Sequence, residues 1–195
     1  IDAGANDGKS AEMLAKLFKT QTVFAIEPLR PNVEAIQRLQ VANIRVLHGG
    51  LGQYSSTTRT YPSLLNKKPG SIFLQINKGT KGDYAYPVYS TDALFKDRKL
   101  AFAHWDVEGS EPEVLKGAVE TLRRDRPILT IETHSMHNAV AHHASLQLLK
   151  TLNYTVYTID EVCGMWKDCR NHVCIPTERK HVNHRVWTFE SRAGA

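Results

Sequence analysis

Short apolar runs alternate along this chain with longer segments in which apolar residues recur every three or four positions. Continuous apolar runs of about four to eight residues are typical of strands buried on both faces of a parallel sheet. Apolar residues at helical spacing predict amphipathic helices. The runs lie at 22–26, 44–47, 100–105, 127–131 and 154–159, and the segments of helical spacing lie at 10–19, 31–41, 111–124 and 139–152.

The remaining segments are less regular. Residues 51–90 are rich in Gly, Ser, Thr and Lys, with candidate strands at 71–76 and 84–89, and we interpret them as an insertion on the rim of the sheet. Residues 161–184 are interpreted as a second insertion, which carries Cys and His, and 185–189 as a last strand. Ser10 is predicted to cap the first helix.

Alternation of strand and helix is the pattern of crossover connections on a mostly parallel sheet. The fold class predicted is α/β and Rossmann-like, with a seven-stranded sheet covered by helices on both faces. A length of 195 residues suits a single domain over 1–195. Because the chain starts at Ile1, within a strand-to-loop junction, the first strand is expected to be truncated.

Acidic residues stand where the predicted strands end. In open sheets of this kind ligands bind beyond the carboxyl ends of the strands. Four of the five strand ends carry a carboxylate, and the fifth carries two glycines; these positions are Asp2, Glu27, Gly49-Gly50, Asp106 and Glu132.

The first strand is followed by the glycine-containing turn Asp2-Ala3-Gly4-Ala5-Asn6-Asp7-Gly8. Gly4 and Gly8 permit backbone conformations that a side chain would block. The turn lacks the G-x-G-x-x-G spacing of a dinucleotide site, and Asp2 is poorly suited to a pyrophosphate, which argues against a nicotinamide-dependent oxidoreductase. Asp2 suits a cofactor with positive charge, such as S-adenosylmethionine. The alternative is a turn with a structural role only.

Glu27-Pro28 ends the second strand, about twenty residues beyond the glycine turn. An acid at this place commonly binds a ribose diol through two hydrogen bonds. The alternative is a surface carboxylate that caps a loop.

A third acidic segment, Asp106-Val107-Glu108-Gly109-Ser110-Glu111, follows the strand that ends at 105. Asp106 and Glu108 are candidates to bind the amino group of the cofactor, to orient an acceptor hydroxyl, or to accept its proton. Glu111 lies at the start of the next helix, where a carboxylate complements the helix dipole, so a structural role is predicted for it.

Glu132 and His134 stand at the end of the next strand. His134 is the preferred general base, because imidazole exchanges protons near neutral pH. A divalent cation held by Asp106, Glu132 and His134 is an alternative. The nearby His137, His142 and His143 are predicted to be surface residues of the following helix.

Cys163, Cys169 and Cys174 form a group with His172, His181 and His184. Their spacing lacks the paired C-x-x-C of common structural zinc sites, so zinc is the least favoured interpretation. A disulfide between Cys163 and Cys169, with Cys174 buried, and three free thiols are about equally favoured. A disulfide would imply an oxidising compartment such as the secretory lumen; otherwise the location is open.

These motifs together resemble the FkbM-type O-methyltransferases. The resemblance covers about residues 1–135 and rests on these segments: 1–8, 26–28 with 31–32, 90–94, 105–118 and 131–132. It implies a class I methyltransferase fold, S-adenosylmethionine as methyl donor, and an acceptor hydroxyl that is often on a sugar or secondary metabolite. By this likeness Gly4, Asn6 and Glu27 would contact the cofactor, and Asp106 and Glu108 would face the transferred methyl group.

The chain departs from the family pattern in two places. His104-Trp105 stands where the family more often has a Lys and an aliphatic residue, and Gly49-Gly50-Leu51-Gly52 replaces a more usual run of small residues. We therefore weigh two functions. The first is O-methylation of a hydroxyl on a sugar, glycan or small metabolite. The second is a binding or assembly module of this fold, without catalysis, within a larger complex.

Charge and hydropathy exclude some partners. The net charge is +5, but Lys and Arg are scattered, without the basic stripe interleaved with aromatic residues that a nucleic-acid groove needs. No nucleic-acid partner is therefore expected. No apolar run reaches the roughly 20 residues of a membrane span.

Overall fold

The central element is a seven-stranded sheet with the strand order β3-β2-β1-β7-β8-β10-β9. The computed structural model describes residues 1–61, 84–135, 138–159 and 169–179. The strands of this sheet are β1 (Asp2–Ala3), β2 (Val23–Glu27), β3 (Ile44–His48), β7 (Phe102–Trp105), β8 (Ile128–His134), β9 (Tyr154–Thr158) and β10 (Cys169–Pro176). Neighbouring strands from β3 to β8 are parallel, and β10 is antiparallel to both β8 and β9. The predicted fold class is confirmed.

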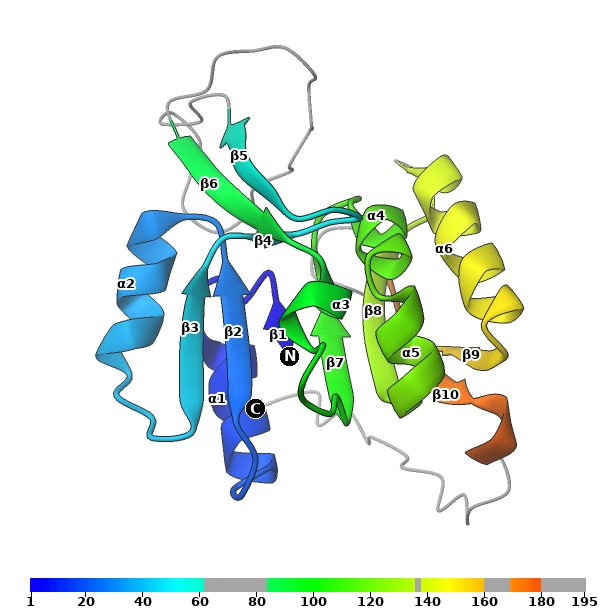
Figure 1. Cartoon of the computed structure of the whole chain (residues 1–195), viewed down its shortest axis with the longest axis horizontal. Coiled ribbons are helices and arrows are strands. Elements are labelled where there is room, and N and C mark those ends of the chain that lie inside the picture. The colour runs from blue at the N-terminus through cyan, green and yellow to red at the C-terminus, as the bar shows by residue number, and fades with distance from the viewer. Residues whose placement is uncertain (62–83, 136–137, 160–168, 180–195) are drawn as a thin grey trace, which may run out of the picture.

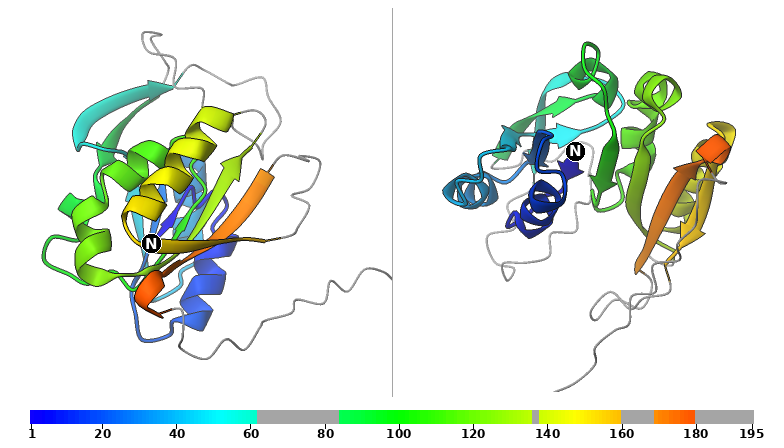
Figure 2. Two further views of the ribbon diagram at one scale, coloured as in Figure 1. Left: turned by 90° about the vertical axis from the view of Figure 1, so that its right-hand side faces the viewer. Right: turned by 90° about the horizontal axis from the view of Figure 1, so that it is seen from below.

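Helices cover the two faces of this sheet (Figure 2). They are α1 (Lys9–Leu17), α2 (Arg30–Arg38), α3 (Thr91–Leu94), α4 (Glu111–Lys116), α5 (Val119–Asp125) and α6 (Ala139–Thr151), with a final 3-10 turn, η1 (Thr177–Arg179). Helices α1 and α2 pack on one face around Leu14, Ala25 and Ile36. None of the described helices is both long and apolar enough to cross a membrane.

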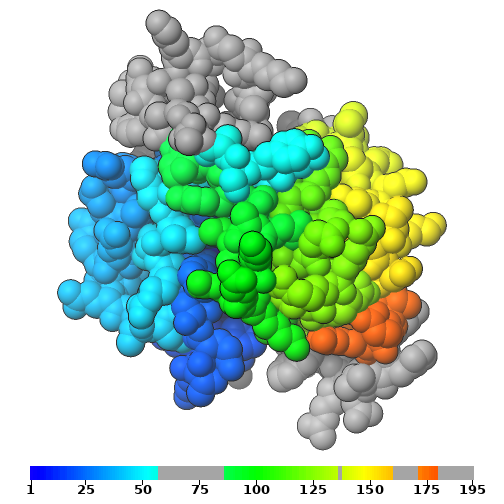
Figure 3. Space-filling view, in the orientation of Figure 1, coloured from blue at the N-terminus to red at the C-terminus, as the bar shows by residue number. Residues whose placement is uncertain are grey.

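The larger part of the core lies on the opposite face. Trp105 and Ile131 are fully buried there against apolar side chains from α4, α5 and α6. In the space-filling view, residues coloured green, from α3 to α5, cover the centre of this face (Figure 3). The apolar strands of the sheet are thus shielded from water, which favours the folded chain by about 25 cal/mol for each Å² of apolar surface buried.

A second, three-stranded sheet lies above the carboxyl ends of the central strands (Figure 1). Its strands are β4 (Gly50–Leu51), β5 (Ser56–Tyr61) and β6 (Tyr84–Tyr89), in the order β4-β6-β5. The predicted strand at 84–89 is observed as β6, whereas the one at 71–76 falls outside the described residues. The amide of Gly49 donates to the Glu27 carbonyl over 3.0 Å, which links the start of this sheet to the end of β2.

Strand β10 comes from the segment that the sequence suggested was an insertion. Its inward residues His172 and Cys174 are 1% and 0% exposed, and the strand pairs along its length with β8. This strand is not predicted from the sequence, because its polar and apolar residues alternate instead of forming a continuous apolar run. Its Cys and His residues are also of the types that bind metals or form disulfides, which favoured an insertion. The strand expected at 185–189 lies outside the described residues.

The helix expected over 111–124 is divided into α4 and α5 at Gly117. A Cβ atom at Gly117 would lie 2.1 Å from the Gly52 carbonyl oxygen, so only glycine allows this close approach to the loop after β4. The Gly117 carbonyl also accepts a hydrogen bond from the Asp92 amide at 2.8 Å. The break therefore agrees with both the low helix propensity of glycine and this tertiary contact.

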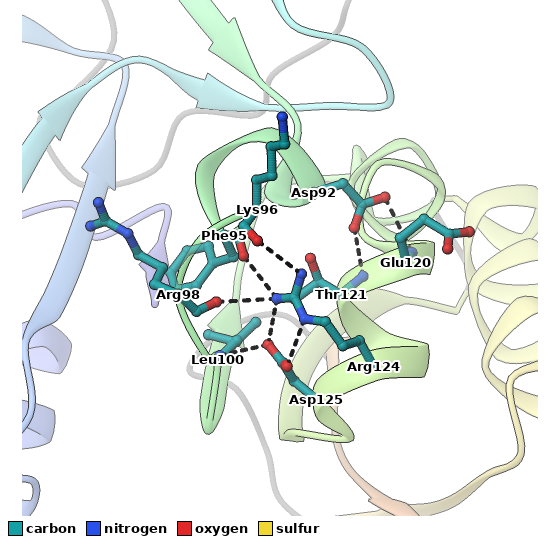
Figure 4. A network of polar contacts seen from close by, with 9 residues as sticks. All are labelled: Asp92, Phe95, Lys96, Arg98, Leu100, Glu120, Thr121, Arg124 and Asp125. Carbon is teal, nitrogen blue, oxygen red and sulfur yellow. Dashed lines mark hydrogen bonds and ion pairs between the residues drawn. The ribbon is translucent and has the colours of Figure 1, made fainter.

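A polar network joins α3, α5 and the segment that leads into β7 (Figure 4). The guanidinium of Arg124 donates to the carbonyls of Phe95 and Arg98 and to the Asp125 carboxylate. Asp125 in turn accepts from the Leu100 amide at 2.8 Å. These bonds fix the entry to β7, the strand that places Asp106 at its carboxyl end.

The Asp92 carboxylate accepts the amides of Glu120 and Thr121, at 3.2 and 2.7 Å, at the start of α5. We predict that Asp92→Ala lowers the free energy of unfolding by about 1 kcal/mol, because two amides in the first turn lose their acceptor. Urea denaturation followed by circular dichroism measures this change. Asp97→Ala, which removes an exposed carboxylate from the same connection, is the matched control and should change stability little.

Candidate active site

The glycine turn brings the end of β1 against the loop that follows β7. Gly4 has φ +80°, and a Cβ atom there would lie only 1.7 Å from the Asp106 carbonyl oxygen. Both the backbone conformation and the space exclude any side chain. Gly4 thus allows the two segments that carry Asp2 and Asp106 to come into contact.

Asp2 is fully buried within β1, behind this turn. Its Oδ2 accepts a hydrogen bond from the Ser10 hydroxyl at 2.7 Å, and its Oδ1 is buried without a hydrogen-bond partner. The prediction that Ser10 caps the first helix is wrong, because α1 begins at Lys9 with Gly8 as its cap residue. The Ser10 side chain instead anchors a carboxylate of the candidate site.

Glu27, at the end of β2, holds the glycine turn from the other side. Its Oε2 accepts from the Asn6 amide at 2.8 Å and its Oε1 from the Leu29 amide at 2.9 Å. The side chain of Asn32 donates to the Asn6 side chain at 3.1 Å. Glu27 is only 4% exposed, so it is not the surface carboxylate of the alternative interpretation.

Gly8 and Pro28 are placed by packing and backbone contacts. A Cβ atom on Gly8 would meet Leu39 and Ile36 at 2.8 and 3.0 Å, so this glycine serves the approach of α1 to α2. The Pro28 carbonyl lies 2.9 Å from Nε2 of His48 at the end of β3. These contacts support the glycine turn and the end of β2, and the cofactor contacts predicted for Gly8 and Pro28 stay a prediction.

The loop after β7 turns through two left-handed residues, Glu108 at φ +53° and Gly109 at φ +93°. A residue other than glycine pays about 1–2 kcal/mol for this conformation. The Glu111 carboxylate, 2% exposed, accepts from the Gly109 amide at 2.9 Å and so closes the loop. The structure thus gives Glu111 a structural role, but through the loop before the helix, since the start of α4 has no side-chain cap hydrogen bond. Glu108 is held in a strained conformation beside the site.

Five carboxylates of this region have raised pKa values, and burial is the largest cause for each; they are Asp2, Glu27, Asp106, Glu108 and Glu111. The charge of Asp2 further raises the pKa of Glu27 and of Asp106. For Glu108 and Glu111 the pKa reaches about 7. We call Asp2, Glu27, Asp106 and Glu108 the acidic edge.

Glu132 and His134 lie inside β8, which continues beyond the strand end predicted at residue 131 because β10 pairs with it as far as His134. Nε2 of His134 lies 3.6 Å from a carboxylate oxygen of Glu108 and 3.6 Å from one of Glu132. The His134 side chain is 7% exposed. The imidazole of His134 thus lies between two carboxylates.

A hydrogen-bonded network lies behind this strand, on the packed face. The Thr133 hydroxyl is 2.8 Å from Nδ1 of His142 and 2.9 Å from Nε2 of His172, and Nδ1 of His172 is 3.1 Å from the Thr158 hydroxyl. His142 is partly exposed as well as bonded to this network, and His143 is exposed, so both lie at the surface of α6 as predicted; His137 falls outside the described residues. Since Thr133 stands between Glu132 and His134, the network holds both at fixed positions.

Sequence reasoning also missed the role of His104. Its Nδ1 lies 2.8 Å from the Thr130 hydroxyl, and its charge lowers the pKa values of Asp2 and Asp106 that burial raises. His104 reaches Asp2 because the two residues are paired on β7 and β1, and this register is not indicated by the sequence alone.

The cysteine interpretations are tested only at Cys174. This thiol is free and fully buried, and burial raises its pKa to about 12. The proposed partners Cys163 and Cys169 fall outside the residues whose side chains are described. Within the described part of the chain, no group of three or more His, Cys, Asp or Glu side chains is arranged to hold a metal ion.

The family model for the methyltransferase FkbM domain matches residues 2–156, which is most of the chain. No curated protein sequence matches the chain. The match contains the acidic edge, Glu132 and His134.

Solved structures of methyltransferases share the fold, among them the following two. The methyltransferase FkbM from Methylobacillus flagellatus KT superposes with a TM-score of 0.60 at 22% identity, over 88% of this chain and 42% of that one. An rRNA methylase from Streptococcus thermophilus superposes with a TM-score of 0.53 at 14% identity, over 90% of this chain and 84% of that one. The chain therefore spans less than half the length of the Methylobacillus protein.

The pKa of Glu111 has a consequence for stability. This carboxyl is protonated up to about pH 7 in the folded chain, against an ordinary value of 4.5, so between these values the folded state binds more protons than the unfolded state. Stability must then fall as pH rises through this window. We predict that Glu111→Gln, which stays neutral, weakens this fall by about 3 kcal/mol between pH 4.5 and 8.

Urea denaturation at a series of pH values measures this effect. Glu113→Gln removes a partly exposed carboxylate from the same helical turn and should retain the wild-type pH dependence. A Glu111→Gln variant with the same pH dependence as wild type would contradict the assignment.

Proposed function

Because the chain belongs to the FkbM methyltransferase family, we propose that it is an S-adenosylmethionine-dependent O-methyltransferase that acts on a hydroxyl of a sugar, glycan or small metabolite. The observation that carries this proposal is the acidic edge, in which Asp2 and Glu27 are buried and Asp106 and Glu108 are partly buried. Asp2 raises the pKa values of Glu27 and Asp106, and Asp106 raises the pKa of Glu108, so these carboxylates lie close together. Buried carboxylates of this kind favour the binding of a cation, which offsets their mutual repulsion.

The residues present fit a cationic methyl donor. Oδ1 of Asp2 and Oδ1 of Asp106 are both buried without a hydrogen-bond partner. A buried polar atom without a partner is unfavourable, so a ligand that donates a hydrogen bond or brings positive charge is stabilised at this place. Asp106 would hold the amino group of the donor, and Asp2 would contribute negative charge from behind the turn.

Glu27 fits the ribose of the same donor. Each of its carboxylate oxygens accepts one backbone amide, and a carboxylate has about four lone-pair sites, so two remain for a diol. Gly4 and Asn6 place the backbone of the turn beside it, and Gly8 and Pro28 support this arrangement from behind. The backbone bonds to Glu27 fix its orientation before a ligand arrives.

When bound, S-adenosylmethionine would supply an activated methyl group on a sulfonium that is already a good leaving group. The protein's own task is to align an acceptor oxygen with that group and to remove the hydroxyl proton. His134 accepts this proton at Nε2. Glu108 and Glu132, each 3.6 Å from that nitrogen, then stabilise the imidazolium. The products are the methyl ether, the demethylated donor and one proton, which His134 releases to solvent.

Isothermal titration calorimetry tests donor binding. We predict that the wild-type chain binds S-adenosylmethionine and that Asp106→Asn, which keeps the shape of the side chain and removes its charge, weakens binding at least tenfold. Glu113→Gln, which removes a carboxylate away from the site, should bind as wild type does. Absence of binding to the wild-type chain, or binding of NAD in its place, would contradict the proposal.

Proton removal by His134 is tested separately from binding. We predict that His134→Asn lowers the rate of methyl transfer by about 100-fold or more, the ordinary contribution of a general base, while the affinity for S-adenosylmethionine stays within threefold of wild type. His143→Asn, at the exposed histidine of α6, is the control. The readout is incorporation of labelled methyl groups into a panel of alcohols, and an undiminished rate in His134→Asn would rule out this role.

A further inference from the structure

Polar side chains continue from the acidic edge across the next two strands of the sheet. His104 on β7 is paired with Thr130 on β8, and Glu132 on β8 is paired with Asn171 on β10. All four side chains are partly buried. We call His104, Thr130, Glu132 and Asn171 the polar row.

The polar row faces away from the main core. Side chains alternate between the two faces of a strand. The intervening residues Leu129, Ile131 and His172 are at most 1% exposed and pack on the face covered by α4 and α6. The polar row therefore belongs to the opposite face, where each of its four residues is partly exposed.

The polar row begins beside the group that accepts the proton. A carboxylate oxygen of Glu132 lies 3.6 Å from Nε2 of His134. Trp105 is paired with Ile131 on the parallel strand β8, so the residues that follow them, Asp106 and Glu132, lie at one level. Glu132 is in turn paired with Asn171 on β10, so Asn171 lies at the same level. With strands about 4.8 Å apart, the backbone positions of Asp106 and Asn171 are about 10 Å from each other. An acceptor bound along this line has a hydroxyl within reach of His134.

The charges along this line select against an anion. Neither β7 nor β8 contains a Lys or Arg, and Arg170 on β10 is paired with Thr133, whose side chain lies on the packed face. The line carries the carboxylates of Asp106 and Glu132, with Glu108 beside His134. These three carboxylates outnumber the imidazoles of His104 and His134. Like charges at short range repel strongly where water is partly excluded. The Asn171 amide can both donate to and accept from a hydroxyl, and it adds no charge. A molecule with several hydroxyls and no negative charge therefore complements these groups.

We propose that the polar row binds the acceptor and selects an uncharged, polyhydroxylated molecule, with Asn171 as a residue that determines this specificity. The inference rests on the proposed methyl transfer and adds to it where the acceptor lies and which charge it carries. In the reaction the acceptor oxygen forms a bond to the methyl carbon, the bond from carbon to sulfur breaks with its electron pair on sulfur, and the hydroxyl proton passes to His134.

The wild-type chain provides the first test. Methyl incorporation from labelled S-adenosylmethionine is compared within pairs of sugars that differ in charge: methyl glucoside and methyl glucuronide, methyl galactoside and methyl galacturonide, mannose and mannose 6-phosphate. We expect the neutral member to be methylated at least tenfold faster in each pair that reacts. An equal or faster rate for the anionic member overturns the inference, as does a chain that binds the donor but methylates none of these sugars. Failure to bind the donor overturns the proposed function itself.

Substitutions of Asn171 provide the second test. Asn171→Lys should raise the rate for the anionic member relative to the neutral one at least fivefold, and Asn171→Asp should lower it. The matched control is Thr155→Lys on β9, which adds the same charge at a distance from the polar row. Thr155 is paired with Ile175, and Ile175 lies four residues from Asn171 along β10. Circular dichroism confirms that each variant folds. A rate ratio that is the same in wild type, Asn171→Lys and Asn171→Asp overturns the role of Asn171.

Discussion

The structure depends on burying several carboxylates beside one another at the edge of a parallel sheet. Removing a carboxylate from water is unfavourable, and a second negative charge nearby adds to the cost, so the pKa values of Asp2, Glu27, Asp106 and Glu108 are all raised. The protein partly compensates with the Ser10 hydroxyl, backbone amides and the histidines at 104 and 134. The compensation is incomplete, because Asp2 and Asp106 each retain a buried oxygen without a partner. A cationic ligand would supply the missing charge.

The fold sets this arrangement through the order of its strands. Because β1 lies between β2 and β7, the ends of these three strands are adjacent, and Gly4 lets the first turn touch the loop after β7. β8 then places Glu132 and His134 one strand farther along, and β10 adds Asn171. The proposed donor site, the proposed proton acceptor and the polar row thus follow one another across the sheet.

Much of the architecture follows from the sequence, because buried parallel strands and amphipathic helices have distinct hydrophobic periods. The strand ends at Glu27 and Asp106 were located correctly by that reasoning. It failed where tertiary contacts decide. The loop after β4 approaches the chain at Gly117, where α4 ends, and Ser10 bonds to Asp2 rather than capping α1. Strand β10 alternates polar with apolar residues, a pattern that suggested an insertion. Asn171 could not be found from sequence, since its importance comes from antiparallel pairing with Glu132.

The most direct test of the central claim is the number of protons exchanged when S-adenosylmethionine binds, measured by calorimetry near pH 6.5 in buffers of different ionisation enthalpy. A cation bound beside carboxylates of raised pKa lowers those pKa values, so the account predicts net proton release and an affinity that increases with pH. S-adenosylhomocysteine, which lacks the sulfonium charge, should release fewer protons. Proton uptake on binding, or equal exchange with the two ligands, would contradict the account.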